Sequence, residues 1–209
     1  MALPTIVNAS GITRLTLKAT VSCLVGDLIG HDGTDWVLAD ADGRIPASYI
    51  AMESVPAGST VQVCNAGTLL DTDAPYTVGA DQYLSATAGA HGAIPAPSTT
   101  LTIVQRIGRA VSTSELAFDL SHRPPMVMRA NATVDPASIS AASAANTAVT
   151  VTGIAAGDVV TPIPPATLEA IAVQSAISST NTVTLRLVND SAGAIDPASA
   201  TWTFYAHRY

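Results

Sequence analysis

Apolar and polar residues alternate with a two-residue period along several short stretches of this chain. In residues 182–188 apolar side chains occupy every second position, at Val183, Leu185 and Leu187, and residues 201–207 repeat the period. Successive side chains of a strand point to opposite faces, so the pattern indicates strands with one buried face. Short strands between Gly, Asp and Pro turns are typical of small barrels and sandwiches. The sequence therefore predicts an all-β protein.

The chain is long enough for two domains with modest cores, at 209 residues and 48% hydrophobic content. We expect residues 1–20 to form an extended N-terminal arm, because their scattered apolar residues follow no helical period. Residues 21–122 are predicted to form a small β-barrel or sandwich-like domain. A proline-bearing linker, residues 123–130, then leads to a C-terminal antiparallel β-sandwich at residues 131–209.

The first domain contains strand patterns with an identifiable core side. Residues 21–38 follow a strand, turn, strand pattern, which predicts that Trp36 and Leu38 point into a core. Val61 and Val63 alternate on one face of a later strand. These positions are the expected core of the first domain.

Residues 77–120 predict a β-unit around which the first domain is organised. Apolar and polar residues alternate from Leu101 to Ile107, which predicts one continuous strand. Gly108 is expected to end that strand, and residues 111–120 to supply a last extended piece.

Residues 137–145 present a conflict between propensity and pattern. Their alanines favour a helix, but Ser and Asn interrupt them and no apolar stripe forms. We expect a loop or an edge strand.

Charged residues make up only 12% of the chain, and Lys18 is its single lysine. Faces rich in Ala, Thr and Val carry few charges to keep copies apart, so they favour contact with another protein. A net charge of −7 without clustered Lys and Arg argues against a nucleic-acid partner. These features favour a component of a protein assembly.

The chain lacks the about 18 consecutive apolar residues of a membrane-spanning helix. Its first residues also lack the basic start and long apolar stretch of a secretory signal. We therefore expect synthesis in a cytoplasm and no membrane partner. In that compartment Cys23 and Cys64 are best interpreted as buried thiols in neighbouring strands, with a disulfide as the less favoured alternative.

Several acidic residues fall in the predicted turns of the first domain. They are Asp27, Asp32, Asp35, Asp40 and Asp42. Calcium is one interpretation, but aligning Gly43 with the glycine of an EF-hand loop puts Leu38 and Tyr49 where oxygen ligands are required. Carboxylates that stabilise turns are the better interpretation.

No residue pattern points to catalysis. Asp119, Ser121 and His122 have the residue types of a nucleophile triad, but adjacency in sequence does not give triad geometry and there is no G-x-S-x-G elbow. The four histidines lack metal-ligand spacing. We expect no enzyme activity, no cofactor and no metal.

Four segments of the second domain carry a family resemblance. They are TVTGIAAGDVVT at residues 150–161, TNTVTLRLVN at 180–189, AIDPA at 194–198 and TWTFYAHR at 201–208. Together they resemble the C-terminal β-sandwich of head decoration proteins of tailed bacteriophages. The resemblance extends over residues 138–208.

The first domain more weakly resembles phage capsid cement domains, through VGADQYLSATAG at residues 78–89 and IVQRIGRAVS at residues 103–112. The resemblance implies a homotrimer on the outer capsid surface of the virion that bridges subunits of the major capsid protein. Residues 21–122 would then be the capsid-binding domain. Two alternatives stay open: another virion surface protein, such as a head fibre or tail ornament, and a carbohydrate-binding enzyme or adhesin domain. Only 4% of the residues are aromatic, which disfavours a sugar platform.

The expected arm supplies the candidate interface residues Leu3, Ile6, Val7 and Ile12. Without an amphipathic period the arm cannot bury these side chains efficiently by itself. Addition of the arm to the sheet edge of a neighbouring subunit would satisfy its backbone. We therefore expect the arm to reach a neighbouring subunit.

Overall fold

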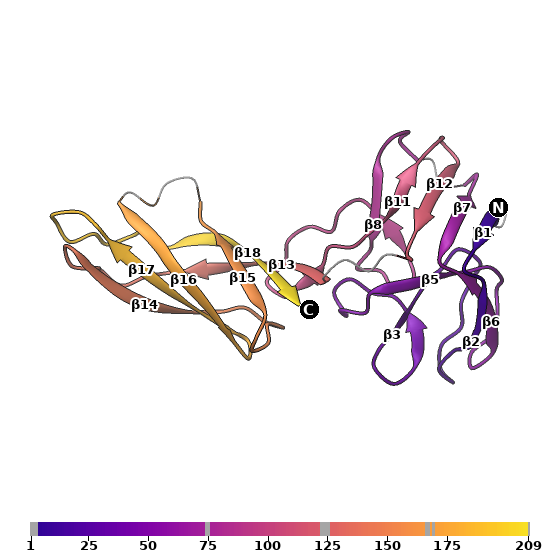
Figure 1. The fold of residues 1–209 in the computed structure, drawn as a ribbon, viewed down its shortest axis with the longest axis horizontal. Coiled ribbons are helices and arrows are strands. Elements are labelled where there is room, and N and C mark those ends of the chain that lie inside the picture. Colours follow the sequence, from indigo (N-terminus) through magenta and orange to yellow (C-terminus); the bar gives the residue numbers. More distant parts are fainter. Residues whose placement is uncertain (1–3, 74–75, 122–125, 166–167, 169, 209) are drawn as a thin grey trace. The chain divides into compact units, whose positions relative to one another are not determined.

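The computed structural model describes residues 4–73, 76–121, 126–165, 168 and 170–208. These residues form eighteen strands and no helix, which confirms the predicted all-β class (Figure 1). None of them therefore belongs to a helix that could cross a membrane. The chain divides into two compact units: unit 1 comprises residues 1–96 and 103–124, and unit 2 comprises residues 97–102 and 125–209.

The first sheet of unit 1 has the strand order β1-β7-β12-β11-β8-β9, with antiparallel neighbours. Its strands are β1 (Thr5–Ser10), β7 (Ala66–Leu70), β8 (Asp81–Leu84), β9 (His91–Gly92), β11 (Arg106–Ala110) and β12 (Glu115–Asp119). Leu69, Leu84, Ile107 and Leu116 are fully buried or nearly so, and they supply the apolar side of this sheet.

The second sheet of unit 1 has the order β2-β6-β5-β3-β4. Its strands are β2 (Thr13–Thr16), β3 (Leu28–His31), β4 (Trp36–Leu38), β5 (Ala47–Ala51) and β6 (Thr60–Cys64). Val61 and Val63 are fully buried, and Trp36 and Leu38 pack against the same core cluster. Both predictions about the core of the first domain are confirmed.

Two segments of unit 1 run from one sheet into the other. The first passes from β1 to β2 and the second from β6 to β7. They change sheet side by side, the first at Gly11 and the second at Asn65, whose amide donates to the Ser10 carbonyl at 3.3 Å. Gly11 has a φ of 60°, and a Cβ at this position would lie 2.0 Å from the Asn65 Oδ1 atom. Strands β1 and β2 thus place residues 5–10 in one sheet and residues 13–16 in the other, which corrects the expected separate arm over these residues.

Gln105 connects the two sheets of unit 1. Its side-chain amide donates to the Ala47 carbonyl and accepts from the Ala47 amide, both at 2.8 Å. This residue lies in a break between β10 (Thr102–Ile103) and β11, so the predicted continuous strand over residues 101–107 is wrong. Gly108 was expected to end a strand, but it lies inside β11.

Unit 2 is sandwich-like, with sheets of order β10-β13-β18-β15 and β14-β17-β16. Its remaining strands are β13 (Met126–Val134), β14 (Ser143–Thr150), β15 (Val159–Ile163), β16 (Ile171–Ser179), β17 (Thr182–Asn189) and β18 (Ala200–Arg208). Residues 126–130 of the expected linker belong to β13, and its residues 123–125 lie outside the described ranges. A nine-residue strand replaces the linker because Met128, Ala130 and the next alternate residues face the core.

The alternation predicted in unit 2 is confirmed. Val183, Leu185 and Leu187 are fully buried in β17, and Trp202 and Phe204 are buried in β18. The Ala-rich stretch ends in β14, which is an edge strand, so the edge-strand alternative holds for residues 143–145.

Candidate interaction surface

The predicted interface residues lie on or next to an edge strand of unit 1. Ile6 and Val7 belong to β1, which pairs with β7 through Ile6↔Leu69 and Val7↔Thr68. The Val7 side chain is 38% exposed and that of Ile12 is 51% exposed, whereas Ile6 is half-buried. Leu3 lies outside the described residues. The structure therefore brings Val7 and Ile12 to the surface while one edge of β1 is satisfied within the chain.

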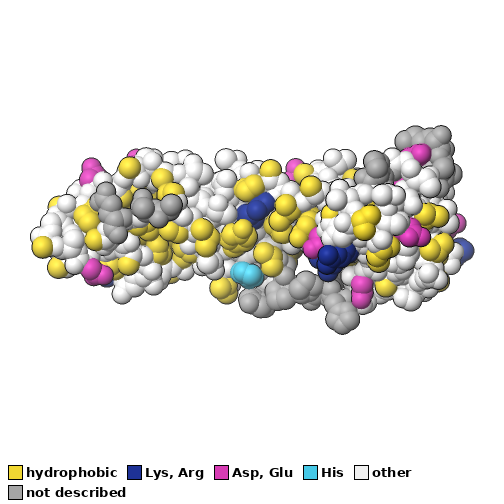
Figure 2. Space-filling view, turned by 90° about the horizontal axis from the view of Figure 1, so that it is seen from above, with side chains coloured by type: hydrophobic (Ala, Val, Ile, Leu, Met, Phe, Trp, Pro, Cys, Tyr) yellow, Lys and Arg dark blue, Asp and Glu magenta, His cyan; other side chains and the backbone are white. Residues whose placement is uncertain are grey.

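Further apolar side chains are exposed on both units. In unit 1 they are Leu24, Val78, Ile94 and Val111, and in unit 2 they are Val159, Ile163 and Ile177. Figure 2 shows one face of the molecule, where apolar side chains are common and charged ones are few. Surfaces with this composition lose little hydration free energy on contact with another protein.

Asp27 and Asp32 stabilise turns, as the better interpretation of the sequence predicted for the acidic residues of the first domain. Asp27 accepts a hydrogen bond from the Leu24 amide at 2.8 Å. Asp32 accepts from the amides of Thr34 and Asp35, both at 2.8 Å, and these hydrogen bonds lower the pKa of its carboxyl. Among the described residues no group of three His, Cys, Asp or Glu side chains is arranged to hold a metal ion.

The single lysine joins the same turns. The Lys18 Nζ atom lies 3.5 Å from Asp32 and 3.4 Å from Asp35. This ion pair is exposed, so it contributes little to stability. It joins the turn between β3 and β4 to the residue that follows the bridge between Leu17 and Trp36.

A shallow pocket of about 390 Å³ lies beside these turns. It is lined by Thr20, Val21, Ser22, Asp32, Val37, Leu38, Asp40, Ile45 and Ala88. Burial raises the pKa of the Asp40 carboxyl, and the neighbouring Asp42 carboxyl raises it further. The Asp40 Oδ1 atom is buried without a partner. The lining contains the two carboxylates of Asp32 and Asp40, and no histidine, cysteine, lysine or arginine.

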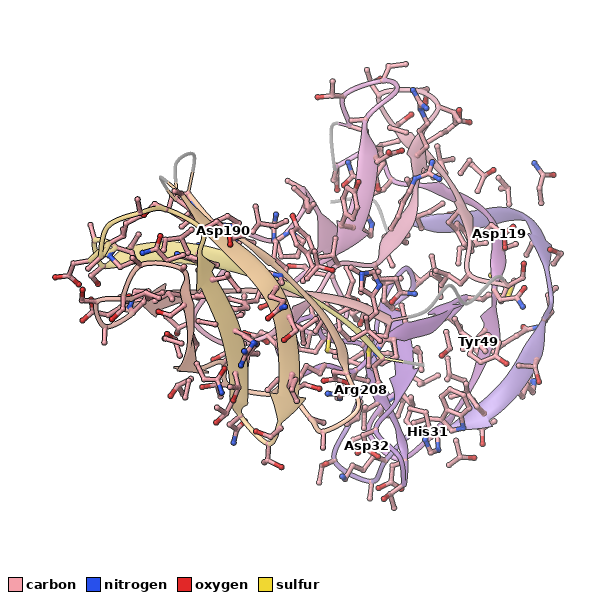
Figure 3. All side chains as sticks on the ribbon, turned by 60° about the vertical axis from the view of Figure 1, so that its left-hand side comes forward. His31, Asp32, Tyr49, Asp119, Asp190 and Arg208 are labelled. Carbon is pink, nitrogen blue, oxygen red and sulfur yellow. The ribbon has the colours of Figure 1, made fainter. Side chains whose placement is uncertain are left out.

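Three aromatic rings pack against one another in the second sheet of unit 1. His31 meets Trp36 edge to face at a centroid distance of 4.9 Å, and Trp36 meets Tyr49 at 5.5 Å. Figure 3 labels His31 and Tyr49. Trp36 and Tyr49 also pack against the core. Sugar binding uses a flat exposed ring face, and these rings instead pack edge to face against each other.

Two of the candidate triad residues, Asp119 and Ser121, are hydrogen-bonded to each other. The Ser121 hydroxyl and amide both donate to Asp119 Oδ1, at 2.5 and 2.9 Å. His122 lies outside the described residues. Because the serine hydroxyl donates to the carboxylate directly, Asp119 does not orient a base toward Ser121 in this geometry.

Tyr76 and His91 form a buried stacked pair in unit 1, with ring centroids 5.9 Å apart. Burial raises the pKa of Tyr76 to about 12 and lowers the pKa of His91. The Tyr76 hydroxyl and the His91 Nδ1 atom are buried without partners.

Cys23 and Cys64 are also buried, and both are free thiols. Burial raises the pKa of Cys64 to about 11, so this thiol is unreactive at neutral pH.

An ion pair in unit 2 joins Arg208 of β18 to Asp158 in the turn before β15. Arg208 donates from Nε and Nη2 to the two carboxylate oxygens of Asp158, at 2.8 and 2.7 Å. The Asp158 side chain is 3% exposed. The Arg208 guanidinium lowers the pKa of Asp158, and the Ala155 amide donates to the same carboxylate. Nothing in the sequence analysis identified this pairing of Asp158 with Arg208.

Asn189 is a fully buried amide at the end of β17. Its Nδ2 atom donates to the carbonyls of Ile139, Ser140 and Gly193, at 2.9, 3.2 and 2.8 Å. Its Oδ1 atom accepts from the amide and hydroxyl of Ser191. One side chain thus connects two loops at this end of the unit, a role that sequence analysis also missed.

Comparison of the chain with known protein families, curated proteins and solved structures gives no match. Support for a function therefore comes from the residues of this chain. The described polar clusters stabilise turns and loops, and the exposed apolar side chains are available for contact.

Proposed function

We propose that this chain is a non-enzymatic structural protein of a bacteriophage virion. It decorates the outer capsid surface and stabilises the shell by bridging subunits of the major capsid protein. The observation that carries the proposal is the exposure of Val7 and Ile12 at the uncharged edge strand of unit 1. The resemblance of residues 150–161 and 180–208 to head decoration proteins supplies the class of partner.

The edge of β1 favours side-chain contact over strand addition. The pairing of β1 with β7 shifts register between Val7 and Ser10, and Asn8 there has a φ of 51°. A bulge of this kind interrupts the regular ladder that an added strand needs. Capsid attachment through β1 would therefore use the Val7 and Ile12 side chains.

The copies would act as a homotrimer through contacts that include unit 1. Two features support a trimer: the low charge of the chain, and the three-fold positions of the capsid that the resemblance implies. For a contact of roughly 1,600 Å² the gain per copy can reach several kcal/mol after the costs of association. A shell multiplies this gain over many copies.

The test is co-sedimentation of the purified protein with capsids of the phage that encodes it, stripped of the native copies. We expect Val7→Glu and Ile12→Glu to reduce the bound fraction at least about tenfold, since each buries a charge at the contact. Ile177→Glu, on unit 2, is the matched control and should bind as the unchanged protein does. Equal binding by all variants would refute unit 1 as the attachment site. No binding by the unchanged protein would refute the capsid role itself.

A further inference from the structure

Strand β14 is a long, regular edge of unit 2. It pairs with β17 in unbroken register from Ser143↔Asn189 to Thr150↔Thr182. In the order β14-β17-β16 its other side has no strand neighbour along Ser143–Thr150, and two residues beyond its end Thr152 forms an isolated bridge with Thr100. Its sequence SAANTAVT contains no charge, no proline and no glycine. An edge of this kind is a template for pairing with another chain.

The other sheet edges among the described residues carry features that oppose pairing. Edge β16 shifts register between Val173 and Ser175, and edge β15 contains Pro162. Edge β1 shifts register between Val7 and Ser10. Edges β4, β9 and β10 have three, two and two residues, and β2 has four. Charges, bulges, prolines and short length are the usual protections of an edge, and β14 has none of them.

The register shows which backbone groups β14 presents. Val151 continues the ladder, and its amide donates to the Asn181 carbonyl at 3.0 Å. Amide direction alternates along a strand, so the odd-numbered residues of β14 bond to β17. The amides and carbonyls of Ala144, Asn146, Ala148 and Thr150 therefore face the free edge.

We propose that β14 pairs antiparallel with β14 of a second copy of this chain, which joins two three-stranded sheets across a two-fold axis. With the axis at Thr147, Asn146 lies opposite Ala148 of the second copy and Ala144 lies opposite Thr150. The free amides and carbonyls of both strands then face each other, because all four positions are even-numbered. The pairing is self-complementary, as an isologous contact requires.

Charge and side-chain size also fit a second copy. Among the outward-facing residues of β14 and of its neighbour β17, Arg186 alone is charged. Its Nε atom donates to Gln174 on β16 at 2.6 Å, away from the edge. Two Arg186 residues would be separated by three strand spacings, roughly 14 Å, which exceeds the Debye length of about 8 Å at physiological ionic strength. The side chains that meet across the axis are Ala, Asn and Thr, so no bulky group blocks close approach.

The inference goes beyond the capsid role, because it concerns copies of the chain in solution. A trimer formed through unit 1 would leave β14 free, so the pairing would link one trimer to another. Sedimentation of the purified full chain therefore tests the pairing without any capsid. Failure of capsid binding and failure of strand pairing are separate results.

The experiment measures the weight-average mass between about 1 and about 200 µM protein. We expect the mass to rise with concentration, and Asn146→Lys to abolish the rise because it puts a charge on the pairing edge. Asn146→Pro should do the same by removing an edge amide. Ala172→Lys is the matched control: it adds the same charge to an exposed site on the opposite edge of the same sheet, and it should associate normally. In a Trp36→Phe background, the emission of Trp202 verifies that unit 2 is folded in each variant.

Cross-linking tests the register. Thr147→Cys should form a covalent dimer on mild oxidation, because the two-fold axis brings the two thiols together, whereas Ser175→Cys on β16 should not. The proposal is overturned by a constant mass together with no covalent dimer. It is also overturned if Asn146→Lys and Asn146→Pro associate as the unchanged protein does.

Discussion

Arg208 and Asp158 form a two-point ion pair that joins the last strand of unit 2 to the turn before β15. The carboxylate is buried and the guanidinium is one-third exposed. Arg208 Nη2 also donates to the Gly153 carbonyl at 3.3 Å, and Ser178 donates its hydroxyl to the Asp158 carbonyl at 2.7 Å. The pair therefore fixes the end of the sandwich from both sheets.

Removal of the guanidinium should destabilise unit 2 strongly. We expect Arg208→Met to cost about 3 kcal/mol, because it leaves a buried carboxylate without its partner. Asp158→Asn combined with Arg208→Met should recover part of the loss. Urea unfolding followed by Trp202 emission in a Trp36→Phe background measures unit 2 alone, because the chain has two tryptophans and each unit contains one. A loss below about 0.5 kcal/mol would contradict the role of the pair.

The same pair predicts the acid sensitivity of unit 2. The pKa of Asp158 is lower in the folded chain than its ordinary value, so its stabilising contribution is complete above the unfolded pKa of about 3.9. The contribution is lost as the pH falls through the folded pKa. We expect the unfolding free energy of unit 2 to decline below about pH 4, and to decline less steeply in Arg208→Met. Identical pH profiles would contradict this assignment.

Unit 1 should lose stability in a different pH range. The pKa of His91 is lowered by burial, so the folded chain favours the neutral imidazole. The contribution of His91 is complete above its unfolded pKa of about 6.5 and declines as the pH falls below it. His91→Gln should flatten the pH dependence of the urea unfolding midpoint of unit 1 between about pH 5 and 7, with Trp36 emission as the probe. His207→Gln, in unit 2, is the control and should leave the profile of unit 1 unchanged.

Asn189 gives a third test of the described packing. Asn189→Asp replaces an amide that donates to three carbonyls with a carboxylate that can only repel them, so we expect a loss of about 3 kcal/mol from unit 2. At about 1 µM protein, where strand pairing is least, Asn146→Asp makes the same chemical change at an exposed position and should cost less than about 0.5 kcal/mol. Unfolding of the two variants at the same urea concentration would contradict this role of the Asn189 amide.

Gly108 should tolerate no side chain. A Cβ at this position would lie 2.2 Å from the Ala117 carbonyl oxygen on the neighbouring strand β12. We expect Gly108→Ala to destabilise unit 1 by about 2 kcal/mol. Gly92→Ala in the same sheet meets no atom within 4 Å and is the control. Equal thermal midpoints for both variants would show that the strands separate easily at this point.

Alternation in the sequence predicts the class and much of the core, but not the polar contacts at the strand ends. Asn189 continues the inward row of Val183, Leu185 and Leu187, and Arg208 continues the inward row of β18. A polar residue at the end of an inward row requires a buried partner, and this signal was available. The partner itself was not predictable, since Asp158 lies fifty residues away in sequence from Arg208.

Long-range pairing explains the other differences. The alternation from Leu101 to Ile107 predicted one strand, but Gln105 bonds to Ala47, fifty-eight residues away, and interrupts it. The N-terminal residues carry no strand signal strong enough to exclude an arm, and they become strands because β6 and β7 offer edges to pair with. Local patterns do not specify such partners. The interface prediction for Val7 and Ile12 stays a prediction, because exposure alone does not identify what covers them.

The central proposal is that copies of this chain stabilise a capsid through weakly charged contacts. The most direct measurement is the heat or osmotic rupture threshold of virions stripped of the protein, before and after it is added back, at low salt and at about 0.5 M salt. We predict that the protein restores the threshold at both salt concentrations, because apolar contacts are not screened. An unchanged threshold after the protein is added back would contradict the stabilising role. Restoration only at low salt would show that ion pairs, and not the apolar side chains of unit 1, carry the attachment.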